Sequence, residues 1–266
     1  LIKDRTMSKD DAKIGIVGGA GPYAGLDLAQ KILQQTQANN DQDYLPTLLI
    51  STPDLIEDRT SFLLGENSRN PAHAISRNLL DLKALGATVA GIPCNTAHAP
   101  AIQDVFLEKL KQSGSDLKVL DMISETADFL QKECVNVKTV GVLSTLGTWK
   151  VGFYPGLLGA FGYEVRTLTE DRQQRLHNEA LFHPEYGIKV QAHPVTTKAR
   201  NVLLEGFETL EKQGAQAIIL GCTEIPLGLP ERKIGETFCI DTSLILARAL
   251  IREFSPEKLI PWSWGT

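Results

Sequence analysis

The sequence predicts an α/β protein made of two similar halves, with parallel sheets flanked by helices. Short apolar runs typical of buried strands alternate with longer segments typical of helices along most of the chain. This alternation is characteristic of parallel sheets with helices on both faces. Two strand-and-loop segments also recur at matched spacing, which indicates two related halves. A site in the cleft between the halves is therefore expected.

The elements of the first half follow from apolar runs, helix-like segments and turn residues. Its predicted strands are 13–19, 47–51 and 87–93. Its predicted helices are 22–37, 71–85 and 99–112. The second of these helices opens with Pro71, and proline suits the first turn of a helix because its missing N–H would have no partner there.

The second half repeats this rhythm. Its predicted strands are 139–144 and 215–221, and its predicted helices are 148–161 and 197–213. "IGIVGGAGPYAG" (14–25) resembles "VGVLSTLGTWKVG" (140–152) as a strand, a loop of small residues and a helix start. Internal similarity at fixed spacing favours two α/β units over one continuous sheet.

The clearest part of the repeat contains a cysteine. "GATVAGIPCNT" begins at Gly86 and "GAQAIILGCTE" begins at Gly214; Cys94 and Cys222 each lie eight positions after that glycine. Ligand sites in open parallel sheets form beyond the carboxyl ends of the strands. A pseudo-twofold arrangement of the halves would therefore place the two cysteines opposite each other across one cleft.

Composition limits the class of protein. The chain has 266 residues with 42% hydrophobic and 22% charged residues, as in soluble enzymes, and a formal net charge of -5, which argues against nucleic acid as a partner. No apolar run approaches the roughly 20 residues of a membrane span. The N-terminal "LIKDRTMSKDDA" lacks a signal-peptide core, and Met7 is a candidate start. A cytoplasmic location and free thiols are therefore expected.

The four cysteines are not equivalent. No polar motif surrounds Cys134 or Cys239, which predicts buried core residues. Cys94 and Cys222 each open a strand-to-helix loop and are followed by hydroxyl, amide or carboxylate residues. Backbone N–H groups and a helix N-terminus in such a loop favour a thiolate. These two cysteines are the candidate reactive groups.

Motifs for other kinds of site are less well supported by the sequence than the cysteine pair. A zinc site could use the C-x3-H pair Cys94 and His98 with Cys222, but C-x2-C, H-x3-H and HExxH spacings do not occur, so no metal is predicted. The sequence also lacks G-x-S-x-G, and "GGAGPYAG" fits neither a dinucleotide fingerprint nor a Walker A loop. It is more typical of a tight, anion-cradling turn at a helix N-terminus.

Ordered motifs in this chain resemble a known family. "PCNTAH" (93–98) and "GCTE" (221–224) resemble the two cysteine motifs of the cofactor-independent aspartate/glutamate racemase family. "GIVGGAGP" (15–22), "DRTSFLLG" (58–65) and "TEDRQQRLHNEAL" (169–181) are similar to its aspartate racemase branch. The resemblance implies two similar α/β domains, each with a four-stranded parallel sheet flanked by helices and with the active site in the cleft between them. It implies one domain from 1–120 plus 238–266, a second from 121–237, no cofactor and a homodimer.

The resemblance also implies site roles. Racemisation removes the Cα proton from one face of an amino acid and returns a proton to the other, so Cys94 and Cys222 are the predicted pair of catalytic acid and base. Arg59 matches the arginine that clamps the side-chain carboxylate, and Lys189 matches a second cationic contact. The candidates around the α-carboxylate are Asn95, Thr96, Thr148 and Thr223.

At this point the sequence leaves alternatives for both the substrate and the reaction. Ala20 replaces a methionine common in the family loop, Glu57 replaces a proline, and Val190 and Gln191 replace small residues, so glutamate is a possible substrate beside aspartate. A maleate-isomerase-like or decarboxylase-like enzyme acting on a diacid, or a non-catalytic amino-acid-binding protein, are the alternatives. The remaining motif and loop histidines are interpreted as structural or surface groups: His98, His177, His183 and His193.

Overall fold

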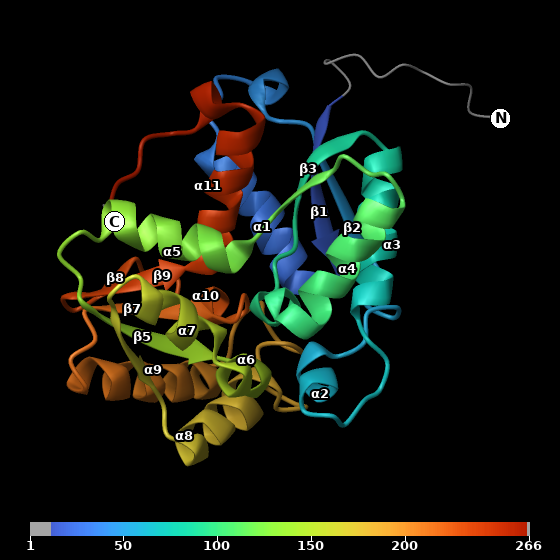
Figure 1. The fold of residues 1–266 in the computed structure, drawn as a ribbon. Coiled ribbons are helices and arrows are strands. Elements are labelled where there is room, and N and C mark those ends of the chain that lie inside the picture. The colour runs from blue at the N-terminus through green and yellow to red at the C-terminus, as the bar shows by residue number, and fades with distance from the viewer. Residues whose placement is uncertain (1–11, 265–266) are drawn as a thin grey trace, which may run out of the picture.

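Two sheets flanked by helices form the core of the computed structural model, which describes residues 12–264 (Figure 1). The strands are β1 (Lys13–Gly18), β2 (Thr47–Ser51), β3 (Ala87–Gly91), β4 (Lys118–Leu120), β5 (Thr139–Ser144), β6 (Glu164–Thr167), β7 (Ala217–Gly221), β8 (Lys233–Ile234) and β9 (Thr237–Asp241). The first sheet has the order β2-β1-β3-β4 and the second the order β6-β5-β7-β9-β8. The predicted fold class is confirmed. The second sheet adds one short antiparallel strand, β8, to the four parallel strands expected.

Helices cover both sheets and supply the turns around the site. They are α1 (Pro22–Gln35), α2 (Arg59–Leu63), α3 (Ala72–Ala84), α4 (Pro100–Gln112), α5 (Met122–Glu133), α6 (Leu146–Val151), α7 (Phe153–Ala160), α8 (Glu170–Arg175), α9 (Thr197–Lys212), α10 (Ile225–Gly228) and α11 (Thr242–Phe254). Short 3-10 turns are η2 (Asp41–Asp43), η3 (Asn95–His98) and η5 (Pro256–Lys258), and η4 (Leu176–Leu181) is a π-helical turn.

α9 illustrates how the sequence pattern produces a helix. Its buried residues recur at intervals of three and four, so they form one stripe: Ala199, Val202, Leu203, Gly206, Phe207 and Leu210. The side chain of Thr196 accepts a hydrogen bond from the backbone N–H of Ala199 at 3.2 Å and caps the N-terminus. The stripe packs with Leu143 of β5 and Ile218 of β7 in one hydrophobic core.

The internal repeat is visible in the strand order. β1 and β3 are the adjacent inner strands of the first sheet, and β5 and β7 occupy the matching places in the second. Gly86 and Gly214 precede β3 and β7 with φ values of +103° and +90°. Glycine adopts such left-handed backbone conformations without the penalty of a Cβ atom. The matched spacing therefore reflects a repeated unit of turn, strand and cysteine loop.

One predicted helix was wrong in its extent. The segment 148–161 was expected to be continuous, but the structure has α6 and α7 there. Gly152 separates them with φ +66°, and its N–H bonds the carbonyl of Thr148 at 3.2 Å. A left-handed residue ends an α-helix because it turns the next peptide away from the helix axis. The break leaves Thr148 in a short, separately capped helix.

The chain crosses between the two halves at equivalent places. Asp121 follows β4 and caps α5, and Asp241 ends β9 and caps α11. Residues of α5 pack in a core with β5 and β7, whereas residues of α11 pack in a core with β1. The two domains 1–120 plus 238–266 and 121–237 stay a prediction as units. In the structure β9 hydrogen-bonds within the second sheet, and α11 packs against α1 of the first half.

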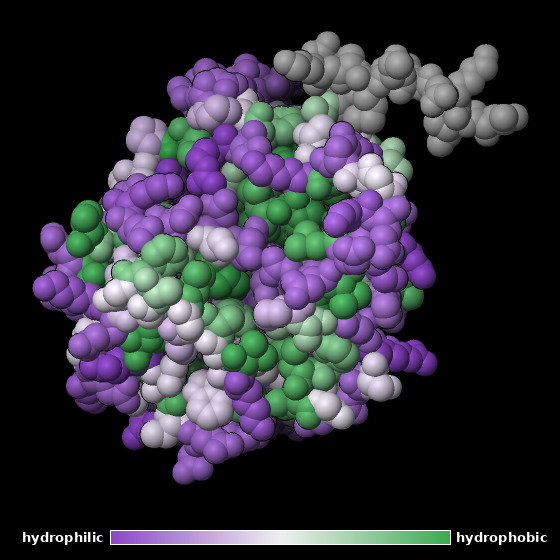
Figure 2. Space-filling view, in the orientation of Figure 1, coloured by the Kyte–Doolittle hydropathy of each residue, from purple (hydrophilic) through white to green (hydrophobic). Residues whose placement is uncertain are grey.

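The surface carries mixed residue types. On the face drawn in Figure 2, hydrophobic residues appear as separate patches among hydrophilic ones. Within residues 12–264, no helix has the length and apolar character needed to cross a membrane. The expected start at Met7 and the charged stretch around it lie outside the described residues.

Candidate active site

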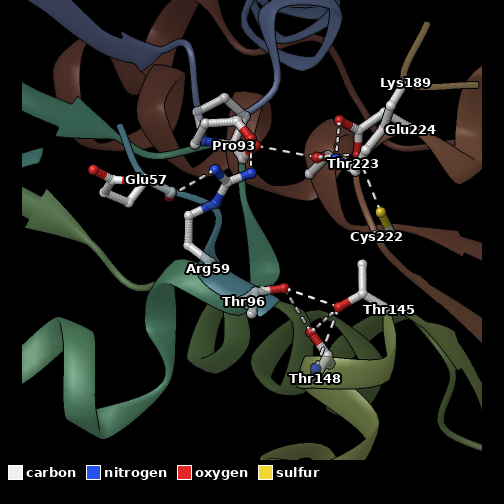
Figure 3. A network of polar contacts seen from close by, with 11 residues as sticks. Glu57, Arg59, Pro93, Thr96, Thr145, Thr148, Lys189, Cys222, Thr223 and Glu224 are labelled. Atoms are coloured by element: carbon white, nitrogen blue, oxygen red, sulfur yellow. Dashed lines mark hydrogen bonds and ion pairs between the residues drawn. The ribbon is translucent and has the colours of Figure 1, made fainter. Parts of the chain in front are cut away.

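The two cysteine loops lie against each other. Cys94 follows β3, Cys222 follows β7, and both side chains are buried. The hydroxyl of Thr223 donates a hydrogen bond to the carbonyl oxygen of Pro93 at 3.1 Å, across 130 positions of sequence (Figure 3). The two halves of the repeat therefore meet at their cysteines, as the strand-end argument predicted.

One small cavity contains both cysteines. Its volume is about 10 Å³, which is room for about one water molecule. Seven of the eight predicted site residues line it: Arg59, Cys94, Asn95, Thr96, Lys189, Cys222 and Thr223. Thr148 does not line it but contacts Thr96. Ala20 is also not a lining residue, so its small side chain does not enlarge this closed cavity.

Arg59 supplies a buried cation beside Cys94. It begins α2, where Asp58 accepts a hydrogen bond from the N–H of Ser61 at 2.8 Å and caps the helix. The guanidinium donates to the carbonyl oxygens of Ala20 and Glu57, and its Nε has no partner. Burial lowers the pKa of Arg59, and the nearby charges of Cys94, Asp58 and Glu224 raise it above its ordinary value. Arg59 is therefore a permanent cation with a free donor.

Glu224 organises the second cysteine. It accepts hydrogen bonds from Lys189 Nζ at 2.8 Å, from Cys222 Sγ at 3.1 Å and from Thr223 Oγ1 at 3.3 Å (Figure 3). Burial raises the pKa of Glu224, but Lys189 and Cys222 lower it below its ordinary value. Burial also lowers the pKa of Lys189, and Glu224 raises it above its ordinary value. The two groups form an ion pair in which Glu224 is buried and Lys189 is half-buried.

The protonation of Cys222 follows from this pair. Burial, then the negative charge of Glu224, raise the pKa of the Cys222 thiol well above its ordinary range. The thiol donates its proton toward Glu224 Oε2. Gly21 leaves space for the same carboxylate, because a Cβ atom at Gly21 would lie 2.3 Å from Glu224 Oε1. The loop of small residues that begins the chain's first helix thus contacts the second cysteine motif.

A triangle of threonines joins the halves on the other side of the cavity. Thr96 Oγ1 lies 3.1 Å from Thr145 Oγ1 and 2.9 Å from Thr148 Oγ1, and Thr145 bonds Thr148 at 3.2 Å (Figure 3). Thr96 belongs to η3, whereas Thr145 caps α6. Hydroxyl groups both donate and accept, so this cluster can change partners when an anion enters.

Both ends of the Asn95 side-chain amide have hydrogen-bond partners. Its Oδ1 accepts from the Tyr154 hydroxyl at 2.5 Å, and its Nδ2 donates to the Thr242 hydroxyl at 3.1 Å. Thr242 in turn donates to the Leu220 carbonyl oxygen at 3.2 Å. Asn95 lines the cavity, but its side chain connects the first cysteine loop to α7 and α11.

The histidines lie outside the lining of this cavity. Burial lowers the pKa of His98, whose Nε2 lies 3.3 Å from the Ile92 carbonyl oxygen. His177 Nδ1 accepts from the Leu146 N–H at 3.3 Å. His183 stacks on Tyr186, and His193 contacts the ring of Tyr23. In the part of the chain that the structure describes, no group of three His, Cys, Asp or Glu side chains is arranged to hold a metal ion.

Five lining residues were not predicted as site residues: Asp58, Thr60, Thr145, Phe182 and Glu224. Four stand inside motifs already recognised in the sequence, and Glu224 is the last residue of "GCTE". Phe182 follows η4 directly, and Lys189 Nζ lies 5.1 Å from its ring centre. π-helical turns often occur at functional sites. No sequence signal pointed to Phe182, because the turn that positions it has no recognisable pattern.

Fold and site together define a bilobal α/β protein with paired cysteines in a closed cavity between equivalent strand ends. The family model for Asp/Glu/hydantoin racemases matches residues 17–250 of this chain. The chain belongs to the Asp/Glu/hydantoin racemase family, whose racemases are isomerases. This confirms the resemblance drawn from the sequence motifs and the predicted enzyme class.

Individual relatives agree with this membership. The chain is 27% identical to the broad specificity amino-acid racemase RacX of Bacillus subtilis (strain 168), over 91% of this chain and 97% of that protein. It is 28% identical to the glutamate racemase of Pseudomonas entomophila (strain L48), over 96% and 86%. The solved structure of Picrophilus torridus aspartate racemase superimposes with a TM-score of 0.75 and 29% identity, covering 91% of this chain and 94% of that one.

Proposed function

We propose that this protein interconverts L- and D-aspartate by proton transfer between the substrate Cα and the pair Cys94 and Cys222, without pyridoxal phosphate. The observation that carries the proposal is the single cavity in which both cysteines, from equivalent strand ends, lie with the buried cation Arg59 and the half-buried cation Lys189. Removal of the Cα proton on one face and protonation on the other need two groups, unless the substrate rotates within the site.

The two thiols differ in their surroundings, which supports opposite resting states. Cys222 donates to Glu224 and is the thiol, whereas Cys94 has the guanidinium of Arg59 beside it and is assigned the role of the base. In the first half-reaction Cys94 accepts the Cα proton, and Cys222 delivers its proton to the opposite face. The reverse reaction exchanges these roles. Each turnover moves one proton onto one sulfur and one off the other, so charge balances.

Substrate binding requires the site to open. A cavity of about 10 Å³ cannot hold an amino acid. Arg59 Nε is an unused donor, and Lys189 can exchange Glu224 for a substrate carboxylate of the same charge. The α-carboxylate then faces the hydroxyls of Thr96, Thr148 and Thr223 and nearby backbone N–H groups, which stabilise charge as the carbanion forms.

Aspartate is the favoured substrate because the aspartate racemase of Picrophilus torridus is similar in both sequence and structure. Glutamate remains a second candidate, since a glutamate racemase is similar over most of this chain. The broad specificity named for the Bacillus subtilis relative supports testing other amino acids too. A cytoplasmic location and a homodimer remain proposals that rest on the sequence; light scattering measures the latter.

Proton NMR in D₂O tests the reaction. L- and D-aspartate are incubated separately with the protein, and the Cα–H signal and the enantiomer ratio are followed. Exchange of Cα–H with inversion is the expected result. Binding without exchange would identify an amino-acid-binding protein, conversion of maleate to fumarate would identify a maleate isomerase, and carbon dioxide release from a diacid would identify a decarboxylase.

A further inference from the structure

A second, larger cavity lies apart from the cysteines. Its volume is about 320 Å³, within the range of small-molecule sites, and it shares no lining residue with the cysteine cavity. α1, the segment after α10, the end of β9 and the C-terminal stretch around Trp262 and Trp264 enclose it. It therefore joins parts of both halves.

Two buried donors in this cavity have no partner. Arg232 Nη1 and Trp262 Nε1 are shielded from solvent and make no hydrogen bond. The guanidinium lies 4.6 Å from the centre of the Trp262 ring, and among the described residues it forms no ion pair. A buried donor that is left unpaired destabilises the folded state, and a charged donor does so more strongly. Such a pair of donors is matched by an acceptor that carries negative charge.

The buried cation of this cavity, Lys31, already has partners. Lys31 Nζ lies 2.5 Å from Asp27 and 2.6 Å from Asp241, which places it between two carboxylates. Glu231 pairs with Arg200 at the edge. Arg232 is thus the lining cation without a carboxylate of its own.

The apolar part of the lining is aromatic. The rings of Phe129 and Trp262 stand 4.8 Å apart at 85°, and those of Trp262 and Trp264 stand 5.0 Å apart at 88°. Leu244 and Ile245 of α11 complete this side. Rings held edge to face present both a face and an edge to a planar ligand.

We propose that this cavity binds a planar aromatic carboxylate, whose carboxylate accepts from Arg232 and Trp262 and whose ring packs on the aromatic side chains. The bound ligand changes the rate of the reaction at the cysteines. The first part stands on the cavity alone. The second part rests on the proposed racemase function.

The fold connects the two cavities directly. Pro226 and Leu227 of α10 line the larger cavity, and α10 begins at the residue after Glu224. α1 lines its other side and begins just after Ala20, whose carbonyl oxygen accepts from Arg59. A ligand that repositions α1 or α10 therefore moves groups bonded to each cysteine motif.

Calorimetric titration of the full chain tests binding. Indole-3-carboxylate is the probe. Neutral indole, which has only the ring, and acetate, which has only the carboxylate, are titrated for comparison. We expect the probe to bind more tightly than either, and Arg232→Gln to weaken it by about tenfold or more. Arg166→Gln, a surface arginine paired with Glu164, is the matched control and keeps wild-type affinity. Trp262→Phe keeps the ring, loses the donor and weakens binding severalfold.

The outcomes separate the two parts. Binding that persists in Cys94→Ala and Cys222→Ala supports a site distinct from the substrate site, even for a protein without racemase activity. No heat with the probe at millimolar concentration, or equal affinity in Arg232→Gln, overturns the site. Unchanged kcat/KM for aspartate at saturating probe overturns the regulatory part.

Discussion

At the scale of single residues, Glu224 makes the two cysteines chemically different. Its carboxylate collects donors from Lys189, Cys222 and Thr223, whereas no carboxylate hydrogen-bonds Cys94 among the described residues. A symmetric repeat has thus acquired an asymmetric site. The asymmetry suits a two-base reaction, since one sulfur must begin protonated and the other not.

The cysteine pair gives the most direct prediction. Cys94→Ser and Cys222→Ser each lower kcat/KM for aspartate on the order of 10³-fold, because a hydroxyl is a far weaker acid–base group than a thiol near neutral pH. Cys134→Ala is the control, since Cys134 is buried in the second half with no role at the cavity. Racemisation assays measure all three. Substantial activity in either serine variant would rule out the two-cysteine mechanism.

Arg59 gives a prediction about substrate recognition. Arg59→Lys keeps the charge and loses the planar fork, so kcat/KM for aspartate falls by up to about 3 kcal/mol in transition-state terms. Alanine lacks the side-chain carboxylate, so its rate of racemisation should be the same in Arg59→Lys and in the wild type. Arg69→Lys is the control, because Arg69 is mostly exposed. Equal losses for both substrates would place Arg59 elsewhere than at the side chain.

The sequence predicted the site residues unevenly for physical reasons. Cysteine, arginine and lysine in ordered motifs have chemistry of their own, so the sequence pointed to Cys94, Cys222, Arg59 and Lys189, and all four line the cavity. Glu224 was overlooked because an acidic residue in a loop is usually solvated, and only its buried contact with Lys189 reveals its role. The hydrogen bonds of the Asn95 amide could not be predicted from the sequence either, because its partners lie 59 and 147 positions away.

At the scale of elements, Gly152 decides how α6 and α7 meet. Gly152→Ala lowers the free energy of unfolding by about 1 kcal/mol, since φ is +66° and the added Cβ meets no neighbour, leaving backbone strain as the only cost. Gly156→Ala in α7 also has open space but no positive φ, so it raises that energy by about 0.5 kcal/mol. Urea denaturation measures both. Equal effects of the two substitutions would contradict this account.

The contact between α1 and the end of β9 gives a pH prediction. Burial, the largest cause, raises the pKa of Asp27 from 3.8 to about 6. The folded state therefore binds more protons than the unfolded state, so the stabilising contribution is present below about pH 4 and lost as pH rises through about 6. Relative to Asp27→Asn, the wild type loses on the order of 2 kcal/mol of unfolding free energy between pH 4 and 7.

Denaturation at both pH values measures this difference. Asp104→Asn on the exposed face of α4 is the control and follows the wild type at each pH. Parallel pH profiles for wild type and Asp27→Asn would mean that Asp27 titrates normally in the folded protein.

Strong local signals explain which elements were predictable. β2 and β5 begin and end where the apolar runs do, and α9 ends one residue before its expected end. β4, β6, β8 and β9 were not predicted. The first three have two to four residues, and β9 contains only a short apolar run between Thr237 and Asp241. The break at Gly152 was missed because a glycine within an apolar helical pattern does not reveal its φ.

At the scale of the whole molecule, the candidate active site lies where the two halves touch. The Thr223–Pro93 bond and the threonine triangle both connect residues from different sheets. The repeat in the sequence was enough to predict that the two cysteines would face each other. It could not predict how tightly the halves close, because that depends on side chains that meet only in the folded protein.

The bond between the cysteine loops gives the final prediction. Thr223→Val keeps the side-chain shape but removes the donor to the Pro93 carbonyl oxygen, so unfolding free energy falls by about 1–2 kcal/mol. Thr36→Val is the matched control, because buried Thr36 donates to the Ile32 carbonyl oxygen at 2.6 Å at the end of α1. Both variants should lose similar stability.

Only Thr223→Val should slow racemisation, by about 10- to 100-fold in kcat, since a displacement of about 1 Å between reacting groups costs that much. The reason is geometric: Pro93 and Thr223 each adjoin a cysteine, so their bond sets the separation of the two sulfurs across the substrate. Stability measured beside kcat separates the two effects. If Thr223→Val and Thr36→Val lose equal stability and both keep full kcat, the relative position of the halves is held by the threonine triangle, and Thr96→Val becomes the variant that should slow the reaction.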